Sequence, residues 1–391
     1  MYRIGKEEIE ELKKVIESRD LFKINGGLRE SAKVEEKIKS IFGVEYPIFM
    51  TSGHAALTSA LTALGVGPGD QVIVPAYTYI ATAMAVVAVG AIPVIAEVDD
   101  SLTLCPEDTE KKITEHTKAI IPVHIQGFPC KMDKLMEIAK KHNLYVVEDA
   151  CQADGGSFGE KRLGTIGDAG ALSFNYFKLI TCGEGGALLV NDRKLFERAL
   201  IYHDSNAIAF FGDQMSGFET EEFCGNEYRS NELCAAVLNV QLDRLCGILE
   251  DNRKNKKYMM ESLSDVCTFV PSNDIEGDCA TTVAFSFEST EKARKFASFE
   301  GVFGTLPIDT GKHIYSNWKS VMEKRGAYNP LMDPFKMEAN KKIIPDYKPD
   351  MCPYTLDVLS KTVYVNVNPD ETKQDMDKRI EAIRNAIKSL N

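Results

Sequence analysis

The chain lacks an excess of positive charge and any long apolar run. Its 391 residues include 46 Lys and Arg against 58 Asp and Glu, which gives a formal charge of −12. A chain this acidic, without a basic block, is poorly suited to bind nucleic acid or an anionic membrane. Because no run of about 18 apolar residues occurs, we also expect no membrane-spanning helix.

Paired cysteines are missing as well. None of the ten cysteines forms a CxxC pair and no spacing matches a zinc site, so the sequence predicts no metal centre. Residues 1–19 are charged, have a helical pattern and lack the apolar segment of a signal peptide. Scattered thiols without a signal peptide are typical of a reducing compartment, and we expect the protein in the cytoplasm.

The chain does contain an alternation of short apolar runs and amphipathic helical patterns over residues 48–250. Buried strands that alternate with helices predict an α/β fold, with a mainly parallel sheet sandwiched by helices. The apolar runs lie at 72–75, 93–96, 119–123, 144–147 and 187–190, with a clear helical pattern at 132–142. In such sheets ligands bind at the carboxyl ends of the strands, so functional residues should directly follow these runs.

The remaining segments suggest two domains. Before residue 45 we expect a helix, a glycine-containing loop at 25–27 and a second helix. A long helical pattern over 230–263 leads into a mixed α/β remainder that ends in a helix over 371–390. We therefore predict an N-terminal arm and large domain over 1–250 and a smaller C-terminal domain over 251–391.

Two adjacent carboxylates, Glu148 and Asp149, follow the apolar run at 144–147. Side chains alternate along a strand, so only one of the two can face a given side. A carboxylate at a strand end can hold the protonated nitrogen of a heteroaromatic ring, such as the pyridine of pyridoxal phosphate (PLP). Asp149 could equally cap a following helix, and this segment alone leaves both readings open.

Lys178 lies among aromatic and apolar neighbours and precedes a glycine-rich turn at 183–186. Desolvation disfavours the charged form of a lysine, and a neutral amine can form a Schiff base with an aldehyde. Ser173, five residues earlier, could hydrogen-bond a phosphate group. The alternative is a solvated surface lysine.

Two further segments follow predicted strands. Residues 51–57 form a Ser/Gly turn that opens an apolar helix. The free N–H groups of a helix N-terminus suit a phosphate. The same pattern is also typical of an ordinary Ser or Thr cap. Residues 74–82 place Tyr77 and Tyr79 after a strand, where one could stack on a flat ring. At least one of the two should be a core aromatic.

In this order, the four segments resemble the DegT/DnrJ/EryC1/StrS family of PLP-dependent sugar aminotransferases. That family has the fold-type I architecture, which is aspartate aminotransferase-like, and acts as homodimers with active sites at the subunit interface. The resemblance covers nearly the whole chain and is strongest over 51–57, 65–82, 117–133, 146–192 and 225–245.

The resemblance implies a role for the polar residues of the strand ends. Lys178 is implied to be the catalytic lysine that forms the internal aldimine with PLP and carries the proton between cofactor and substrate carbons. Asp149 would pair with the pyridine nitrogen, and Gln152 would lie near the phenolic oxygen. Ser173 would bind the phosphate.

The resemblance also implies several further contacts. The backbone at Gly53 and His54 would complete the phosphate cradle, and Tyr79 would stack on the ring. His313 and Tyr315 resemble a pair that reaches the active site from the C-terminal domain and contacts substrate.

Two positions depart from the family pattern. The family usually has Thr where this chain has His54, which is tolerable if only the backbone N–H binds phosphate. The family commonly reads Gly-x-Asn-Tyr-Arg, with the neighbouring subunit's Asn on the phosphate, but here Glu227 stands at that position. Either Asn226 substitutes for it or the contact is lost.

Family members that act as sugar dehydratases have histidine in place of the lysine, so Lys178 favours transamination. The resemblance implies a ping-pong reaction in which glutamate or glutamine donates the amino group and a keto-sugar accepts it. Residues 148–156, 173–186 and 315–318 look most like the subgroup that aminates 8-oxo-3-deoxy-octulosonate. Nucleotide-linked keto-hexoses and keto-cyclitols stay open as acceptors.

Three other functions compete with this reading. A nicotinamide- or nucleotide-dependent enzyme is disfavoured, because no G-x-G-x-x-G follows the first apolar run and no G-x-x-x-x-G-K-[ST] occurs. A catalytically altered PLP-fold protein could act as a sugar dehydratase or isomerase, or as a non-enzymatic binding partner. The presence of Lys178, Asp149 and Gln152 together argues against a loss of catalysis.

Overall fold

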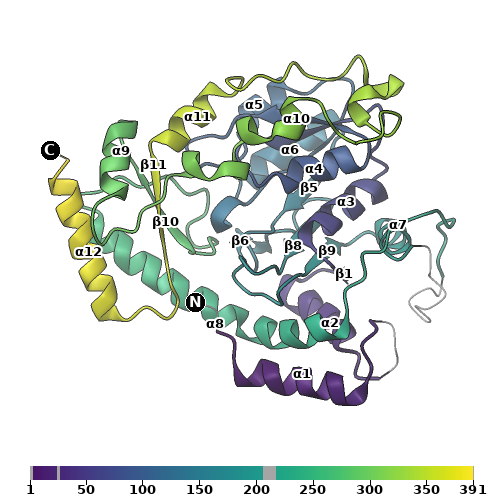
Figure 1. Cartoon of the computed structure of the whole chain (residues 1–391), viewed down its shortest axis with the longest axis horizontal. Helices are drawn as coiled ribbons and strands as arrows, with labels where there is room; N and C mark the ends of the chain where they lie inside the picture. The colour runs from purple at the N-terminus through teal and green to yellow at the C-terminus, as the bar shows by residue number, and fades with distance from the viewer. Residues whose placement is uncertain (1–2, 24–26, 206–216, 391) are drawn as a thin grey trace.

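The computed structural model describes residues 3–23, 27–205 and 217–390; Asn25 and Gly26 of the predicted N-terminal loop lie outside these ranges. The N-terminal arm has the two predicted helices, α1 (Lys6–Ser18) and α2 (Glu30–Phe42). Both pack against α8 (Glu232–Leu263), the long helix that runs below the body of the molecule (Figure 1).

The centre of the molecule is a seven-stranded sheet in the order β1-β9-β8-β5-β4-β2-β3. Its strands are β1 (Tyr46–Met50), β2 (Gln71–Pro75), β3 (Ile92–Ala96), β4 (Thr117–Ile120), β5 (Tyr145–Asp149), β8 (Ala169–Ser173) and β9 (Gly186–Val190). β9 runs antiparallel to both of its neighbours, and the other pairs are parallel. The predicted α/β fold with a mainly parallel sheet is confirmed.

Side chains of each strand alternate between two apolar layers, which is why helices cover both faces. In β2, Val72 and Val74 pack with α3 (Gly53–Ala63), α4 (Ala81–Ala88) and α7 (Arg193–His203). Ile73 between them packs with α6 (Met132–His142) on the opposite face. On this opposite face, α2 and α8 cover the part of the sheet formed by β8, β9 and β1. The short α5 (Pro106–Lys111) and the hairpin of β6 (Ser157–Phe158) and β7 (Lys161–Arg162) complete this unit.

The strand that the apolar run at 119–123 predicts ends earlier than expected. β4 stops at Ile120, and Pro122 follows, which has no N–H to continue a ladder. The Pro122 carbonyl instead accepts a hydrogen bond from Asp149 N at 2.9 Å, and His124 N donates to Asp149 O at 3.1 Å. The 121–124 segment therefore fixes the backbone at the end of β5.

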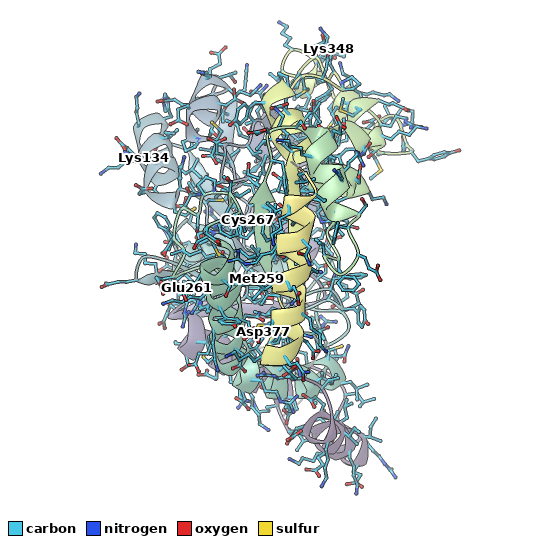
Figure 2. All side chains as sticks on the ribbon, turned by 90° about the vertical axis from the view of Figure 1, so that its left-hand side faces the viewer. Lys134, Met259, Glu261, Cys267, Lys348 and Asp377 are labelled. Atoms are coloured by element: carbon cyan, nitrogen blue, oxygen red, sulfur yellow. The ribbon has the colours of Figure 1, made fainter. Side chains whose placement is uncertain are left out.

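The C-terminal part is a smaller α/β unit. The strands β10 (Thr282–Ser286) and β11 (Thr362–Asn366) pair antiparallel, and α9 (Thr290–Ala297) and α12 (Lys373–Lys388) pack on them with the second half of α8. Figure 2 shows α12 beside α8, with Met259 on α8 and Asp377 on α12. Two further helices are α10 (Lys319–Met322) and α11 (Pro353–Ser360).

The predicted division at residue 250 falls inside α8, which is continuous from Glu232 to Leu263. The first half of α8 packs in the core of the large unit through Leu242 and Leu249, and the second half packs in the C-terminal core through Met259. The boundary stays a prediction. Within the described residues, no helix combines the length and apolar character needed to cross a bilayer.

The two carboxylates at the end of β5 point to opposite faces, as alternation requires. Glu148 is fully buried and accepts hydrogen bonds from the N–H groups of Gly164, Ile166 and Gly167 at 2.9, 2.5 and 2.7 Å. His124 Nε2 lies 3.1 Å from the same carboxylate. Glu148 is therefore the structural member of the pair, and it holds the turn that leads into β8.

We expect Glu148→Gln to lower the free energy of unfolding by roughly 2 kcal/mol or more, because an amide NH₂ would face buried N–H donors. Urea unfolding monitored by circular dichroism measures the loss. Glu137→Gln is the matched control, since Glu137 is exposed on α6 and pairs only with Lys134 at 3.3 Å. Equal stability of the two variants would contradict the role given to Glu148.

Candidate active site

A cleft of about 840 Å³ lies between the carboxyl ends of the sheet and the C-terminal unit. It contains three residues of the predicted site, Lys178, Gln152 and His313. The other lining residues are Arg3, Gln126, Tyr176, Phe177, Leu179, Ile248, Asn252, Thr281, Thr282, Asn366, Val367, Asn368, Pro369 and Arg379. Among the described residues, no carboxylate lines this cleft, although the chain as a whole is acidic.

Lys178 lies in the loop after β8 and is half-buried. The loop is held by local hydrogen bonds: Lys178 N donates to Asn175 O at 3.1 Å, and Phe177 N donates to the Asn175 side chain at 3.0 Å. Phe174 O accepts from Cys182 N at 3.0 Å, which closes the loop. Lys178 is thus half-buried, lines the cleft and forms no ion pair with another described residue.

Asp149 is 5% exposed, and its carboxylate is oriented by two donors. Thr82 Oγ1 donates to Asp149 Oδ2 at 2.7 Å, and Cys151 N donates to Oδ1 at 3.2 Å. The alternative that Asp149 caps a helix is wrong, because no helix follows β5. A buried, oriented carboxylate at a strand end has the chemistry needed to hold a protonated ring nitrogen.

The N-terminus of α3 meets the ends of β8 and β9. A Cβ at Gly53 would lie 2.4 Å from Cys151 Sγ and 3.0 Å from Ser173 Cβ, and one at Gly186 would lie 2.2 Å from the Ser52 carbonyl carbon. The two glycines therefore permit this close approach. Ser52 caps the helix, because its hydroxyl oxygen accepts a hydrogen bond from Ala55 N at 3.1 Å. The alternative prediction of an ordinary serine cap in this segment is therefore confirmed.

Ser173 is the last residue of β8 and is 6% exposed. A Cβ at Gly53 would lie 3.0 Å from Ser173 Cβ, so Ser173 lies beside the N-terminus of α3, and a helix N-terminus suits an anion. His54 is partly buried, with Nδ1 3.3 Å from Ala81 O. Burial lowers the pKa of His54, although Asp149 opposes this shift, so a neutral imidazole lies beside the cradle.

Gln152 lines the cleft and is fixed by a contact that the sequence did not indicate. Gln126 N donates to Gln152 Oε1 at 3.0 Å. Gln126 has φ 54°, which is uncommon for a residue other than glycine, and its carbonyl accepts from Thr281 Oγ1 at 2.8 Å. This left-handed turn therefore connects the predicted site to the C-terminal unit.

The two tyrosines after β2 divide as expected into one core residue and one exposed residue. Tyr77 is 1% exposed and Tyr79 is 46% exposed. The ring centroids of Tyr79 and His313 lie 5.3 Å apart. Burial lowers the pKa of His313, and the positive charge of Lys178 adds to this shift. A neutral His313 thus lines the cleft together with Lys178, and its ring contacts that of Tyr79.

The structure places Tyr315 elsewhere. It is fully buried, donates its hydroxyl to Pro349 O at 2.7 Å and accepts from Cys352 N at 3.0 Å. Its backbone N–H donates to Ala76 O at 3.0 Å, which attaches the C-terminal segment to the end of β2. Because Tyr315 does not line the cleft, we leave it out of the proposed site.

The charge of Glu227, the residue that departs from the family pattern, is neutralised by another residue of this chain. Glu227 forms an ion pair with Arg229, which also pairs with Asp204. Asn226 donates from Nδ2 to the Tyr202 hydroxyl at 2.7 Å. Neither side chain lines the cleft of this chain.

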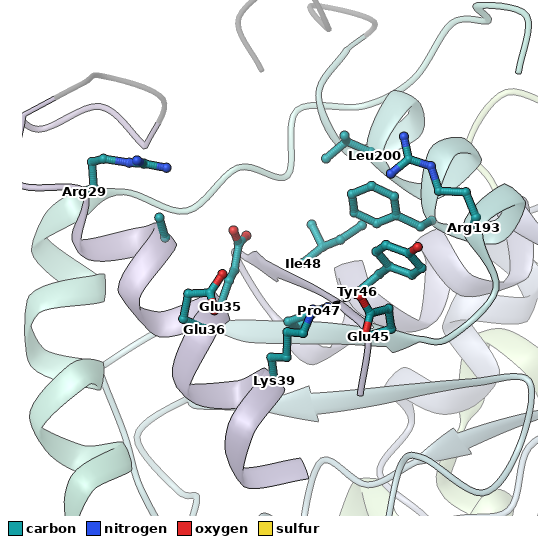
Figure 3. A pocket seen from close by; sticks show the side chains of 12 residues that line it. Arg29, Glu35, Glu36, Lys39, Glu45, Tyr46, Pro47, Ile48, Arg193 and Leu200 are labelled. Atoms are coloured by element: carbon teal, nitrogen blue, oxygen red, sulfur yellow. Dashed lines mark hydrogen bonds and ion pairs between the residues drawn. The ribbon is translucent and has the colours of Figure 1, made fainter. Parts of the chain in front are cut away.

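Another cavity, of about 220 Å³, lies between α2, β1 and α7 (Figure 3). Glutamates of α2 and Arg193 of α7 face it, but none of the predicted site residues does. Glu35 is already engaged by Lys23 at 2.8 Å and by Phe49 N at 3.0 Å. We therefore do not treat this cavity as the functional site.

Among the described residues, no group of three or more His, Cys, Asp or Glu side chains could hold a metal ion.

Sequence reasoning did not assign roles to Thr82, Gln126 or Thr281. Thr82 lies in the segment with Tyr79, and its spacing of one helical turn from Thr78 could have drawn attention to it. Gln126 and Thr281 carry no sequence signal, because their contacts depend on how the C-terminal unit docks.

The chain is similar to known aminotransferases. A protein from Micromonospora echinospora, provisionally named L-glutamine:3-amino-2,3-dideoxy-scyllo-inosose aminotransferase, is 33% identical over 271 residues, which cover 68% of this chain and 63% of that protein. The dTDP-3-amino-3,6-dideoxy-alpha-D-galactopyranose transaminase of Aneurinibacillus thermoaerophilus is 38% identical over 240 residues, which cover 61% of this chain and 64% of that enzyme. The match thus spans less than two thirds of either relative.

The whole fold has close counterparts among solved structures. The aminotransferase from Psychrobacter cryohalolentis superposes with a TM-score of 0.80 at 25% identity, covering 99% of this chain and 98% of that one. A profile of the DegT/DnrJ/EryC1/StrS aminotransferase family matches residues 2–384. With the sheet order and the strand-end residues described above, this match shows that the chain belongs to the DegT/DnrJ/EryC1/StrS aminotransferase family.

Proposed function

We propose that this protein is a PLP-dependent aminotransferase that moves an amino group from glutamate or glutamine to a keto-sugar, with Lys178 as the lysine that binds the cofactor. The observation that carries the proposal is the convergence of Lys178, Gln152 and His313 on one cleft. Asp149 and the Gly53–Ser173 contact lie at the strand ends beside it. The family and its named relatives support the reaction class.

The residues present fit PLP. Asp149 offers a buried carboxylate for the ring nitrogen, and the close approach of Gly53 to Ser173 leaves N–H and hydroxyl groups for the phosphate. When bound, PLP supplies an aldehyde that captures an amine and a ring that takes up electrons.

Each residue then has a defined task. Lys178 Nζ would hold the cofactor aldehyde, and as an amine beside the reacting carbons it could take up and return a proton while the amino group moves. Asp149, oriented by Thr82, would hold the protonated ring nitrogen. Tyr79, whose ring contacts that of His313, would stack on the cofactor ring, and His313 would line the cleft together with Lys178. The neutral state of His313 avoids a second positive charge beside the lysine.

We propose an acceptor that carries a negative charge. The part of the chain that the structure describes lines the cleft with Lys178, Arg3 and Arg379 and with no carboxylate. The acidic partners of the arginines, Asp251 and Asp370 for Arg3 and Glu371 for Arg379, do not line it. A local positive lining on an acidic protein favours anionic ligands. Both a nucleotide-linked keto-hexose and the sugar acid 8-oxo-3-deoxy-octulosonate meet this condition, and a neutral keto-cyclitol does not.

We also propose a homodimer in the cytoplasm. Phe177 is 84% exposed directly beside Lys178, and Tyr176 is 62% exposed, so large apolar groups surround the entrance. Such exposure is typical of a surface that a partner covers. All ten cysteines are free, which fits a reducing compartment. No observation favours dehydration, because position 178 is lysine.

Lys178→Ala should abolish transamination and the visible absorbance that PLP produces on the protein, because no amine remains at this position to bind the aldehyde. Spectra recorded after addition of PLP, then L-glutamate or L-glutamine, measure binding and identify the donor. Lys134→Ala, on the exposed face of α6, is the matched control and should behave as the wild type. A Lys178→Ala variant with full activity would overturn the proposal.

Anionic keto-sugars should show kcat/KM at least roughly tenfold above a neutral keto-cyclitol of similar size, because of the positive cleft lining. The preference should shrink as salt rises from about 0.05 to 0.5 M, since screening weakens attraction between charges. Equal kcat/KM values at both salt concentrations would contradict the proposed acceptor class.

Light scattering of the purified protein should give the mass of two chains. Phe177→Ser should weaken the association if a partner covers the entrance to the cleft, and Phe303→Ser, which changes an equally exposed residue of the C-terminal unit (80%), should not. A monomer at micromolar concentration would count against the shared active site.

A further inference from the structure

Gln126 lines the cleft with a left-handed backbone, and the proposed function gives its side chain no task. Its φ of 54° and ψ of 19° lie in a region that residues other than glycine rarely adopt. Glycine takes this conformation without strain, as the next residue, Gly127, does at φ 81°. Strained residues gather at functional sites, so a long polar side chain at such a position calls for a functional explanation.

The backbone of Gln126 is held by both units of the molecule. Its N–H donates to Gln152 Oε1 at 3.0 Å, and its carbonyl accepts from Thr281 Oγ1 at 2.8 Å. The next carbonyl, that of Gly127, accepts from Cys279 N at 3.2 Å. Because Gln152 belongs to the large unit and Thr281 precedes β10, the turn is fixed from two sides. The Gln126 side chain therefore starts from a defined position in the cleft.

The side-chain amide of Gln126 is oriented by Thr282. Thr282 Oγ1 lies 3.2 Å from Gln126 Oε1, and this is the one hydrogen bond that the hydroxyl makes among the described residues. Thr282 is 1% exposed, and a buried hydroxyl group needs an acceptor for its proton. The amide therefore presents its oxygen to Thr282, and Nε2 lies on the other side of the amide.

Nε2 is the polar atom of Gln126 that is left without a partner. The backbone N–H, the carbonyl and Oε1 are all engaged, whereas Nε2 contacts no acceptor in the part of the chain that the structure describes. The residue is half-buried, and the cleft that it lines also contains Lys178 and Gln152. The cleft thus offers an oriented N–H donor that no group of the protein uses.

We propose that Gln126 is a specificity-determining residue, whose Nε2 donates a hydrogen bond to an oxygen atom of a substrate bound in the cleft. The group that it recognises must be an acceptor, because an amide NH₂ has no lone pair to offer. A carboxylate of the amino donor and a carboxylate or hydroxyl oxygen of a keto-sugar both meet this condition. The inference rests on the proposed function, which places both substrates in this cleft.

Gln126→Glu tests the donor, because a carboxylate has nearly the same shape and still accepts from Thr282 but offers no N–H. Single-turnover measurements give the half-saturating concentration of L-glutamate or L-glutamine in the first half-reaction. The same measurement with 8-oxo-3-deoxy-octulosonate or a nucleotide-linked keto-hexose follows in the second. For the substrate that Gln126 binds, this concentration should rise at least roughly tenfold, which corresponds to the loss of one hydrogen bond. The half-reaction that shows the rise identifies that substrate.

Gln71→Glu is the matched control. Gln71 Nε2 donates to Ile343 O at 2.6 Å, and Gln71 does not line the cleft. This variant should unfold at lower urea concentration but keep every half-saturating concentration, because its amide NH₂ serves the fold. Gln126→Glu should show the reverse, with an unfolding midpoint close to that of the wild type. If Gln126→Glu folds poorly, Gln126→Asn replaces it, since asparagine tolerates the left-handed backbone and its shorter side chain withdraws the donor.

Unchanged half-saturating concentrations in both half-reactions of the folded Gln126 variant would refute the inference. The proposed function is judged separately, on the wild type. If the wild type neither gives the absorbance of bound PLP nor reacts with either amino donor, the proposed function fails. If the wild type completes both half-reactions and the Gln126 variant binds both substrates equally well, only the role given to Gln126 fails.

Discussion

The opposite orientation of Glu148 and Asp149 at the end of β5 is the constraint on which the site depends. Alternation along the strand sends Glu148 into the interior, where three backbone N–H groups and His124 satisfy it. That network fixes the turn at 164–167, and this turn sets the start of β8, which carries Ser173 and leads to Lys178. Asp149 faces the other way and accepts from Thr82. One pair of adjacent carboxylates thus supports the fold through one member, and the other is the residue to which we assign the cofactor ring nitrogen in the proposed function.

The C-terminal unit completes the site by docking on strand ends rather than by contributing a strand. Thr78 N donates to His313 O at 2.9 Å, and Tyr315 N donates to Ala76 O, so the 313–315 segment follows the residues after β2. Thr281 bonds to the left-handed Gln126 turn in the same way. These contacts place His313 across from Lys178. Because α8 joins both cores without a break, the two units are held at a fixed distance along one helix.

Electrostatics distinguish the cleft from the rest of the protein. The overall charge of −12 would repel an anionic substrate, but the described residues that line the cleft are basic, neutral polar or apolar. Three carboxylates lie next to this lining: Asp251 and Asp370 pair with Arg3 at 2.6 and 2.8 Å, and Glu371 pairs with Arg379. These pairs offset the charges of the two arginines, so Lys178 is the basic side chain of the lining that forms no ion pair among the described residues.

The sequence by itself determined the α/β fold, the positions of the central strands and the residues at their carboxyl ends, because strand burial and alternation are local properties. Lys178, Asp149, Gln152, Ser173 and Gly53 follow those strands, so their proximity could be predicted. The sequence did not separate Glu148 from Asp149, place Tyr315 in the core or reveal the partners Thr82 and Gln126. Only the tertiary structure decided these orientations and contacts, because they depend on which face of a strand is buried and on how the C-terminal segments dock. The burial of Asp154, whose carboxyl group has no hydrogen-bonding partner among the described residues, also belongs to this class, since it is a property of the packed molecule alone.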